Sequence, residues 1–350
     1  FEHPNIRERS GLWEKAQRMT LTAIDRASRA QPLPLSYMQQ RLWFLSQFKG
    51  ASAAYHMPAA LRLKGTLDEA ALRRTLDRIV ERHEVLRTVF LDGEGIPVQV
   101  VKEPEKFALQ AFDLSALSPV DRERDVNEHA RLASQEPFDL TRGPLIRGRL
   151  LRLGDEEHVL CVTMHHIVSD GWSMSVLIRE LSELYAAYTE GRDDPLQPLQ
   201  LQYADYAVWQ RQWLQGEVLQ QRVTYWRDHL AGAPALLELP TDRARPAGQS
   251  YIGDEIEFSL GSALSEQLKH LAERQAMTLY MVLHAGFAAF LSMMSGQRDI
   301  VIGTSVANRP RVELEELIGF FVNTLALRLR LEDDPTVAAL LQQAKAITLA

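Results

Sequence analysis

The sequence contains one cysteine, Cys161, which lies within the apolar run VLCVTM. One cysteine cannot build a disulfide framework, and this usage is typical of a reducing cytosol, so we expect a cytoplasmic protein. Long hydrophobic runs are also lacking, because no uninterrupted apolar stretch approaches the ~18 residues that span a membrane. The first segment, FEHPNIRERSGLWEK, has no signal-peptide core. We therefore expect no membrane partner.

An excess of basic residues is absent as well. The 350 residues include 39 Lys and Arg against 46 Asp and Glu, a net charge of −7. This balance argues against a nucleic-acid partner. The sequence has no internal repeat and no low-complexity tract, which excludes repeat architectures. What is present, at 46% hydrophobic residues, is the composition of a globular protein of about two domains.

The ends and the middle of the chain indicate its organisation. It starts without Met and stops inside LLQQAKAITLA, a helical pattern without a cap, so we expect a segment of a longer polypeptide. Residues 1–31 are polar, and QRMTLTAIDRASRAQPLP is typical of an exposed linker. The turn-rich stretch GRDDPLQPLQLQ (191–202) is the predicted boundary between two lobes.

Helical and strand patterns alternate along the chain, which predicts an α/β fold. Thr66 and Glu69 form a capping-box pattern at the start of one predicted helix. The predicted helices cover residues 35–45, 66–82, 121–136, 174–188, 203–232, 262–276 and 278–295. The predicted strands flank the turns at 92–95 and 154–156, and include 254–259, RDIVIGTSV and FFVNTLALRLRL.

Two adjacent histidines, His165 and His166, end the apolar run VLCVTMHH, and Asp170 and Gly171 follow. The run favours a buried strand, whose successive side chains face opposite ways. The two rings should then point apart, so we expect no metal site here. Two interpretations stay open. Asp170 could cap the next helix beside ordinary strand-end histidines, or an imidazole with a pKa near ~6.5 could serve as a general base.

The stretch MHHIVSDGWS (164–173) resembles the HHxxxDG signature of the condensation domains of non-ribosomal peptide synthetases. That family shares its fold with chloramphenicol acetyltransferase. Four more stretches match the family in order: LSYMQQRLWFL (35–45), RHEVLRTVF (82–90), YADYAVWQR (203–211) and IGFFVNTLALR (318–328). Five ordered motifs over residues 35–328 are poorly explained by chance.

The resemblance implies two chloramphenicol acetyltransferase-like lobes in a V, at 32–192 and 193–350, with the active site in the tunnel between them and the second lobe truncated. FEHPNIRE is similar to the end of a peptidyl carrier domain, so 1–16 would be its tail and 17–31 a linker. The implied partners are an upstream donor carrier domain, a downstream acceptor carrier domain and a neighbouring adenylation domain. The domain itself would bind no cofactor, because its substrates ride on 4′-phosphopantetheine arms.

The implied activity is that of an acyltransferase in antibiotic or siderophore synthesis. The α-amine of an acceptor aminoacyl thioester attacks the donor thioester, and an amide bond forms. The intact HH and DGWS distinguish the chain from heterocyclisation, epimerisation and inactive recruiting relatives, and its motifs resemble the subclass for L-configured donors. Two alternatives are a stand-alone acyltransferase that uses an acyl-CoA, and a non-catalytic docking platform. The carrier-like start and the intact motif count against them.

The resemblance also assigns roles to residues. His166 would be the general base or position the amine, the Gly171 N–H would face the oxyanion, and His165 would be a packing residue. Asp170 would brace the loop through an ion pair with an arginine of RHEVLR.

For that arginine we expect Arg87 rather than Arg82, with a solvated helix end as the alternative. Trp209 and Asn323 match motif positions that could line the tunnel or be structural, and core packing is favoured for Trp209. Ser305 lies in GTSVANR, a segment that floors the tunnel in the family.

Overall fold

The computed structural model describes residues 23–48, 52–244, 253, 256–332 and 334–349. The chain forms two compact units. The first comprises Phe1–Val218 and Arg309–Phe321, and the second comprises Leu219–Asn308 and Val322–Ala350. Both contain helices and strands, which confirms the predicted α/β class. The predicted carrier tail (1–16) and the first part of the predicted linker lie outside the described residues.

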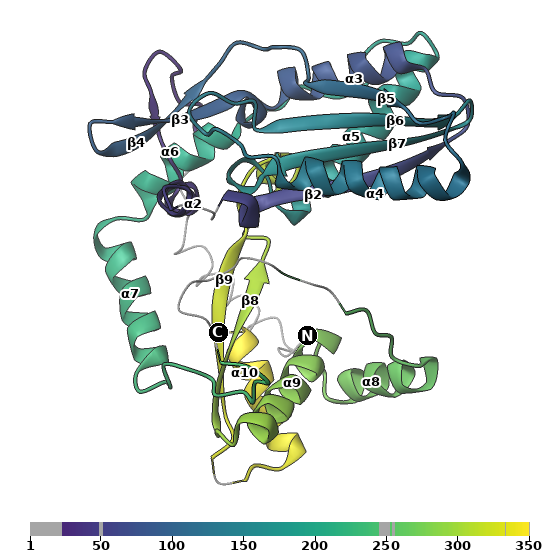
Figure 1. Ribbon diagram of the computed structural model, residues 1–350. Coiled ribbons are helices and arrows are strands. Elements are labelled where there is room, and N and C mark those ends of the chain that lie inside the picture. Colours follow the sequence, from purple (N-terminus) through teal and green to yellow (C-terminus); the bar gives the residue numbers. More distant parts are fainter. Residues whose placement is uncertain (1–22, 49–51, 245–252, 254–255, 333, 350) are drawn as a thin grey trace. The chain divides into compact units, whose positions relative to one another are not determined.

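A four-stranded sheet in the order β2-β7-β6-β5 forms the centre of the first unit (Figure 1). Its strands are β2 (His56–Lys64), β5 (Leu109–Asp113), β6 (Ile146–Gly154) and β7 (Glu157–His165). All pairs are antiparallel except β5 with β6. Because β7 is a central strand, it is buried from His158 to His165, which explains its unbroken apolar run.

Helices cover both faces of this sheet. One helix packs on β2, β6 and β7, and two others pack on each other over the opposite face (Figure 1). The helix on β2, β6 and β7 is α4 (Pro119–Gln135). The pair on the opposite face is α3 (Glu69–Arg82) and α5 (Gly171–Thr189). As a result, the end of β7 and the start of α5 meet at one edge of a rigid layer.

A smaller sheet and several short elements complete the first unit. The sheet has the order β1-β4-β3, and the turn predicted at 92–95 joins two of its strands. The elements are β1 (Leu33–Pro34), β3 (Thr88–Gly93), β4 (Ile96–Val101), α2 (Tyr37–Ser46), α6 (Tyr203–Trp213), η1 (Ser52–Tyr55), η2 (Glu84–Arg87), η3 (His166–Val168) and η4 (Val312–Leu314).

The second unit is built on an antiparallel pair of strands, β8 and β9. Its elements are α8 (Ser262–Arg274), α9 (Leu279–Ser295), β8 (Asp299–Val306), β9 (Asn323–Arg330) and α10 (Val337–Leu349), and α7 (Gly216–Leu230) leads into it. Ala288 and Ala344 are fully buried and let α9 and α10 approach Ile300 and Leu329. Among the described helices, none alone is long and apolar enough to cross a membrane, and α8 and α9 reach that standard only as a pair bent by 107°.

Two local predictions were wrong. The helix predicted from residue 66 begins at Glu69, because the Asp68 carboxylate caps it by accepting a hydrogen bond from the Ala71 N–H at 2.9 Å. Residues 256–259 of the predicted strand 254–259 lie outside any strand, and Ile256 is 88% exposed. In the described part of the chain, β8 and β9 pair only with each other, so this segment has no neighbour to satisfy its backbone.

The observed division of the chain also differs from the predicted boundary after residue 192. Helix α6 follows the turn-rich link but belongs to the first unit. Its Tyr203 is 1% exposed, and its hydroxyl lies 2.8 Å from the Ser36 hydroxyl. The boundary therefore falls after Val218.

Candidate functional site

The two adjacent histidines at the end of β7 lie in different environments. Strand β7 ends at His165, and His166 begins the short helix η3. The predicted reason for their divergence, alternation along one strand, is therefore incomplete, because only His165 is a strand residue. The turn of η3 instead carries the second ring out of the sheet layer.

His166 has a fixed tautomer. Its Nδ1 lies 2.7 Å from the carbonyl oxygen of Ser169. A carbonyl can only accept, so Nδ1 carries a hydrogen, and the only nitrogen of the ring that can offer a lone pair is Nε2. The ring is half-buried and packs on the ring of Phe320 at a centroid distance of 4.7 Å. The chain thus holds one imidazole with an accepting nitrogen in a defined direction.

His165 is fully buried and structural in its contacts. Its Nδ1 accepts a hydrogen bond from the Ile167 N–H at 3.1 Å and so caps η3. Burial, followed by the nearby His56 and His166, lowers the pKa of His165 to about 3. A ring that stays neutral and enclosed fits the packing role expected for it.

Asp170 joins the start of α5 to the segment 309–321. Its Oδ1 accepts hydrogen bonds from the Ser173 N–H at 2.9 Å and from the Ser173 hydroxyl at 2.7 Å, which caps α5. Its Oδ2 accepts from the Phe321 N–H at 3.0 Å. The guanidinium of Arg309 lies 3.2 Å from Oδ1, and both side chains are almost completely buried. Asp170 is therefore both a helix cap and half of a buried ion pair.

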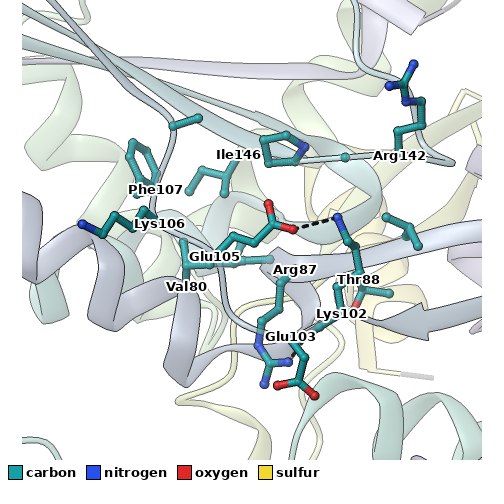
Figure 2. Close-up of a pocket in the computed structure, with 15 residues that line it drawn as sticks. Val80, Arg87, Thr88, Lys102, Glu103, Glu105, Lys106, Phe107, Arg142 and Ile146 are labelled. Carbon is teal, nitrogen blue, oxygen red and sulfur yellow. Dashed lines mark hydrogen bonds and ion pairs between the residues drawn. The ribbon is translucent and has the colours of Figure 1, made fainter.

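The prediction that Asp170 pairs with Arg87, or else Arg82, was wrong. Arg82 is buried against Glu180, with Nε 3.0 Å from Oε1. Arg87 donates to the Lys102 carbonyl and lines a cavity of about 200 Å³ beside Lys102 and Glu103 (Figure 2). The alternative of a solvated helix end does not fit Arg82, which ends α3 but is buried, whereas Arg87 ends η2 and is only partly buried.

Gly171 is the first residue of α5. Its φ lies outside the left-handed region, and a Cβ added there would meet nothing within 4 Å. The turn itself does not require glycine; the position instead leaves open space at the helix start. Among the described residues, no acceptor is bonded to the Gly171 N–H, so this donor remains at the positive end of the helix.

The remaining predicted residues lie elsewhere. Trp209 is 6% exposed on α6 and stacks on Trp213 at 5.4 Å, as a core residue would. Ser305 and Asn323 belong to the second unit, where Ser305 pairs with Thr324 and the Asn323 side chain accepts from the Thr324 N–H. The structure therefore groups His165, His166, Asp170 and Gly171, and it places Trp209, Arg82 and Arg87 in other contacts.

Sequence reasoning missed three residues at this site: Arg309, Phe320 and Tyr203. Arg309 lies just after the predicted strand RDIVIGTSV, and Tyr203 opens the motif YADYAVWQR. Nothing local distinguishes their partners, because the contacts join residues 117 to 154 positions apart. In the ranges that the structure describes, no group of three or more metal-ligating side chains is assembled.

Comparison with known proteins gives consistent matches. Residues 29–350 match the family model described as Condensation domain. Malpinin synthetase of Mortierella alpina is 46% identical over 331 residues, which cover 95% of this chain and 4% of that protein. Malpibaldin synthetase of the same organism is 46% identical over 326 residues, covering 93% of this chain and 6% of that protein. The chain thus spans a small fraction of the length of these relatives.

Solved structures match as well. The X-domain from teicoplanin biosynthesis superposes with a TM-score of 0.84 at 31% identity, covering 93% of this chain and 72% of that one. The first condensation domain of the calcium-dependent antibiotic synthetase, in complex with a substrate analogue, gives a TM-score of 0.78 at 24% identity, over 92% of this chain and 75% of that one. The second likeness concerns the fold alone.

Proposed function

The chain belongs to the condensation-domain family of non-ribosomal peptide synthetases, whose members are acyltransferase-type catalytic domains, and we propose that it joins two carrier-bound substrates through an amide bond. In this reaction the acceptor α-amine attacks the donor thioester carbonyl. The new C–N bond forms, the C–S bond breaks, and the donor thiol leaves with a proton. Both substrates would be thioesters on 4′-phosphopantetheine arms of an upstream and a downstream carrier domain.

The observation that carries this proposal is the fixed tautomer of His166. Because Nδ1 donates to the Ser169 carbonyl, Nε2 is the nitrogen that would meet the α-amine with a lone pair. It could take the proton that the amine must lose or accept a hydrogen bond from it, and groups in this role typically contribute about 10²–10⁴-fold to the rate. Holding two tethered reactants together would add to this contribution.

The Gly171 N–H is proposed to stabilise the negative oxygen of the tetrahedral intermediate. Its position at the N-terminus of α5 and its open surroundings support this role. We assign an L-configured donor and acceptor from the motifs. The V of two lobes around a tunnel, and tunnel-lining roles for Ser305 and Asn323, stay predictions from the resemblance.

A second candidate function is non-catalytic recruitment of a partner enzyme. It is favoured by the 31% identity to the teicoplanin X-domain, and a structure of that X-domain in complex with OxyB also matches this chain, at 32% identity. The presented Nε2 of His166 favours catalysis instead, because a docking platform needs no aligned base.

The test is dipeptide formation from loaded donor and acceptor carriers by the protein in its natural polypeptide. We expect His166→Ala to lower the rate by about 10²–10⁴-fold. His270→Ala is the matched control, because His270 is an exposed histidine of α8 that pairs only with Glu273 in the described residues. Unchanged dipeptide formation in His166→Ala would overturn the catalytic assignment, and an acyl-CoA that replaced the donor carrier would favour a stand-alone acyltransferase.

A further inference from the structure

Two contacts position the imidazole of His166, a hydrogen bond at its Nδ1 edge and the Phe320 ring against one of its faces. The edge is fixed by the Nδ1 hydrogen bond to Ser169. The face is covered by Phe320, whose ring is tilted by 58° at 4.7 Å and which is only 6% exposed. A rotation of the imidazole about its Cβ–Cγ bond would lose the hydrogen bond and change its packing on the Phe320 ring. The direction of Nε2 therefore depends on where the Phe320 ring is held.

Tyr203 holds Phe320 from one side. The Tyr203 hydroxyl donates to the Phe320 carbonyl at 2.6 Å and lies 2.8 Å from the Ser36 hydroxyl. Since a phenol has one hydrogen, Ser36 must be the donor of the second bond. Tyr203 is fully enclosed, and burial raises its pKa well above 10, so it keeps the proton that it donates. The Tyr203 hydroxyl thus connects Ser36, at the start of α2, to the Phe320 carbonyl through two hydrogen bonds.

The neighbouring residues are held from the other side. The Phe321 N–H donates to Asp170 at 3.0 Å, and the Gly319 N–H donates to the Ser173 hydroxyl at 3.0 Å. The Tyr203 ring presses so closely on Gly319 that an added Cβ would lie 2.0 Å from the ring. The peptide between Phe320 and Phe321 is thus bonded at both its carbonyl and its N–H, and the preceding Gly319 is bonded at its own N–H, so Phe320 has little freedom to withdraw from His166.

We propose that Tyr203 is a positioning residue for the reaction: through the Phe320 carbonyl it keeps the Phe320 ring against the imidazole and so fixes the direction of Nε2 in His166. This inference rests on the proposed function in that His166 is the residue that meets the amine. It adds a residue of α6 that touches neither the substrate nor His166. The alternative is that the hydroxyl merely satisfies a buried carbonyl and serves stability alone.

Tyr203→Phe removes the hydroxyl and leaves the ring in place. Tyr206→Phe is the matched control, because Tyr206 lies one turn away on the same helix, packs on Phe321 at 4.7 Å, and accepts from the Gln210 side chain at 2.9 Å. Both variants lose one buried phenolic oxygen, but only Tyr203→Phe loses the bond to Phe320. An effect on His166 in the first variant alone assigns that effect to the Tyr203 hydroxyl, which is bonded to the Phe320 carbonyl and to Ser36.

The direct readout is nitrogen NMR of the protein labelled with ¹⁵N-histidine, with the His166 signals assigned by their loss in His166→Ala. We expect a single tautomer with hydrogen on Nδ1 in the unaltered protein and in Tyr206→Phe. In Tyr203→Phe we expect a mixture of tautomers or exchange-broadened signals. Identical His166 spectra in the two phenylalanine variants would overturn the proposal. This measurement needs no turnover, so it is independent of the proposed function.

The kinetic readout uses loaded carriers. We expect Tyr203→Phe to lower kcat about tenfold at an unchanged KM, because misalignment of a catalytic group weakens the transition state rather than binding. Phe320→Leu is the second variant, in case Tyr203→Phe folds poorly. It keeps the bonded backbone and removes the ring, and it should give the same mixture of tautomers in protein that thermal unfolding shows to be folded. A normal tautomer and a normal kcat in Phe320→Leu would also overturn the proposal.

Discussion

Asp170 and Arg309 form a buried ion pair although 139 positions separate them in the sequence. The facing atoms, Oδ1 and Nη2, are 3.2 Å apart. Nη1 of the same guanidinium donates to the carbonyls of Leu314 and Leu317 at 2.6 and 2.7 Å, whereas its Nε is buried without a hydrogen-bond partner among the described residues. Burial nevertheless lowers the pKa of Arg309 in spite of the attraction of Asp170, so desolvation offsets much of the attraction.

Removing one partner of this pair should therefore lower the free energy of unfolding much more per residue changed than removing both. We expect Arg309→Met to lower the free energy of unfolding by about 3–5 kcal/mol, because it leaves the Asp170 charge buried and unpaired. Adding Asp170→Asn to it should cost much less than the sum of the two single changes. Urea denaturation of the four proteins of this double-mutant cycle checks the prediction, and strictly additive effects would contradict it.

A second buried carboxylate, Glu180, should be as sensitive. It lies 3.0 Å from Arg82 and 2.8 Å from His83, with all three side chains enclosed. Burial raises its pKa, but the bonds and charges of His83 and Arg82 outweigh that effect, and the net pKa is lowered. We expect Glu180→Gln to lower the free energy of unfolding by about 3–5 kcal/mol, because Arg82 is left unpaired.

The matched control for Glu180 is Glu69→Gln. Glu69 pairs with Arg73 at 2.6 Å one turn away on the surface of α3. Exposed pairs of this kind contribute only about 0.3–0.5 kcal/mol. Chemical denaturation should therefore separate the two variants clearly, and similar losses from both would show that Glu180 is not a buried ionic centre.

The buried His165 should make stability depend on pH. Its pKa falls from 6.5 in the unfolded chain to about 3 in the folded protein, chiefly through burial and then through His56 and His166. Below pH ~6.5 the unfolded chain binds a proton that the folded protein refuses, so stability is full above that pH and declines as pH falls toward 3. The decline from this group should total about 5 kcal/mol.

His165→Asn tests this pH dependence, since its amide oxygen can accept the Ile167 N–H in place of Nδ1. Between pH 7 and pH 4 the free energy of unfolding should fall less steeply in the variant. The difference in slope should correspond to the uptake of up to one proton fewer on unfolding. Part of the slope will remain, because burial also lowers the pKa of His56, His129 and His284. An unaltered slope would mean that His165 is protonated in the folded state.

Two glycines of the site should respond oppositely to alanine. In Gly319→Ala the added Cβ would lie 2.0 Å from a ring carbon of Tyr203, a buried ring with no room to move. We expect a loss of about 1–3 kcal/mol in unfolding free energy, as overpacked cores show. In Gly171→Ala the new methyl group meets open space, and stability should be unchanged or slightly raised. Thermal unfolding of both variants would reveal any exception.

Periodicity predicted most of the first unit because its pattern is set by burial. A strand covered on both faces must be apolar throughout, and β7 is. A helix covered on one face must repeat every three or four residues, as α3 and α5 do. The segment 256–259 shows the limit of this reasoning, since a strand needs a partner as well as a pattern.

The partner of Asp170 lay beyond the same reasoning for a physical reason. A guanidinium is chemically identical at Arg82, Arg87 and Arg309, and only the path of the chain decides which one reaches the carboxylate. Capping of α5 by Asp170 was foreseeable, because a cap depends on three neighbouring residues. The bond from Tyr203 to Phe320 was not, because it depends on the packing of two distant segments.

The two compact units are interleaved along the chain, since Arg309–Phe321 belongs to the first unit while the strands on either side of it, β8 and β9, belong to the second. This interleaving bears on recombination between related synthetases. A single crossover after Val218 would take Asp170 and Tyr203 from one parent. Their partners, Arg309 and Phe320, would come from the other. Exchange of the first unit as a coherent piece therefore requires two stretches of the chain to be inherited together.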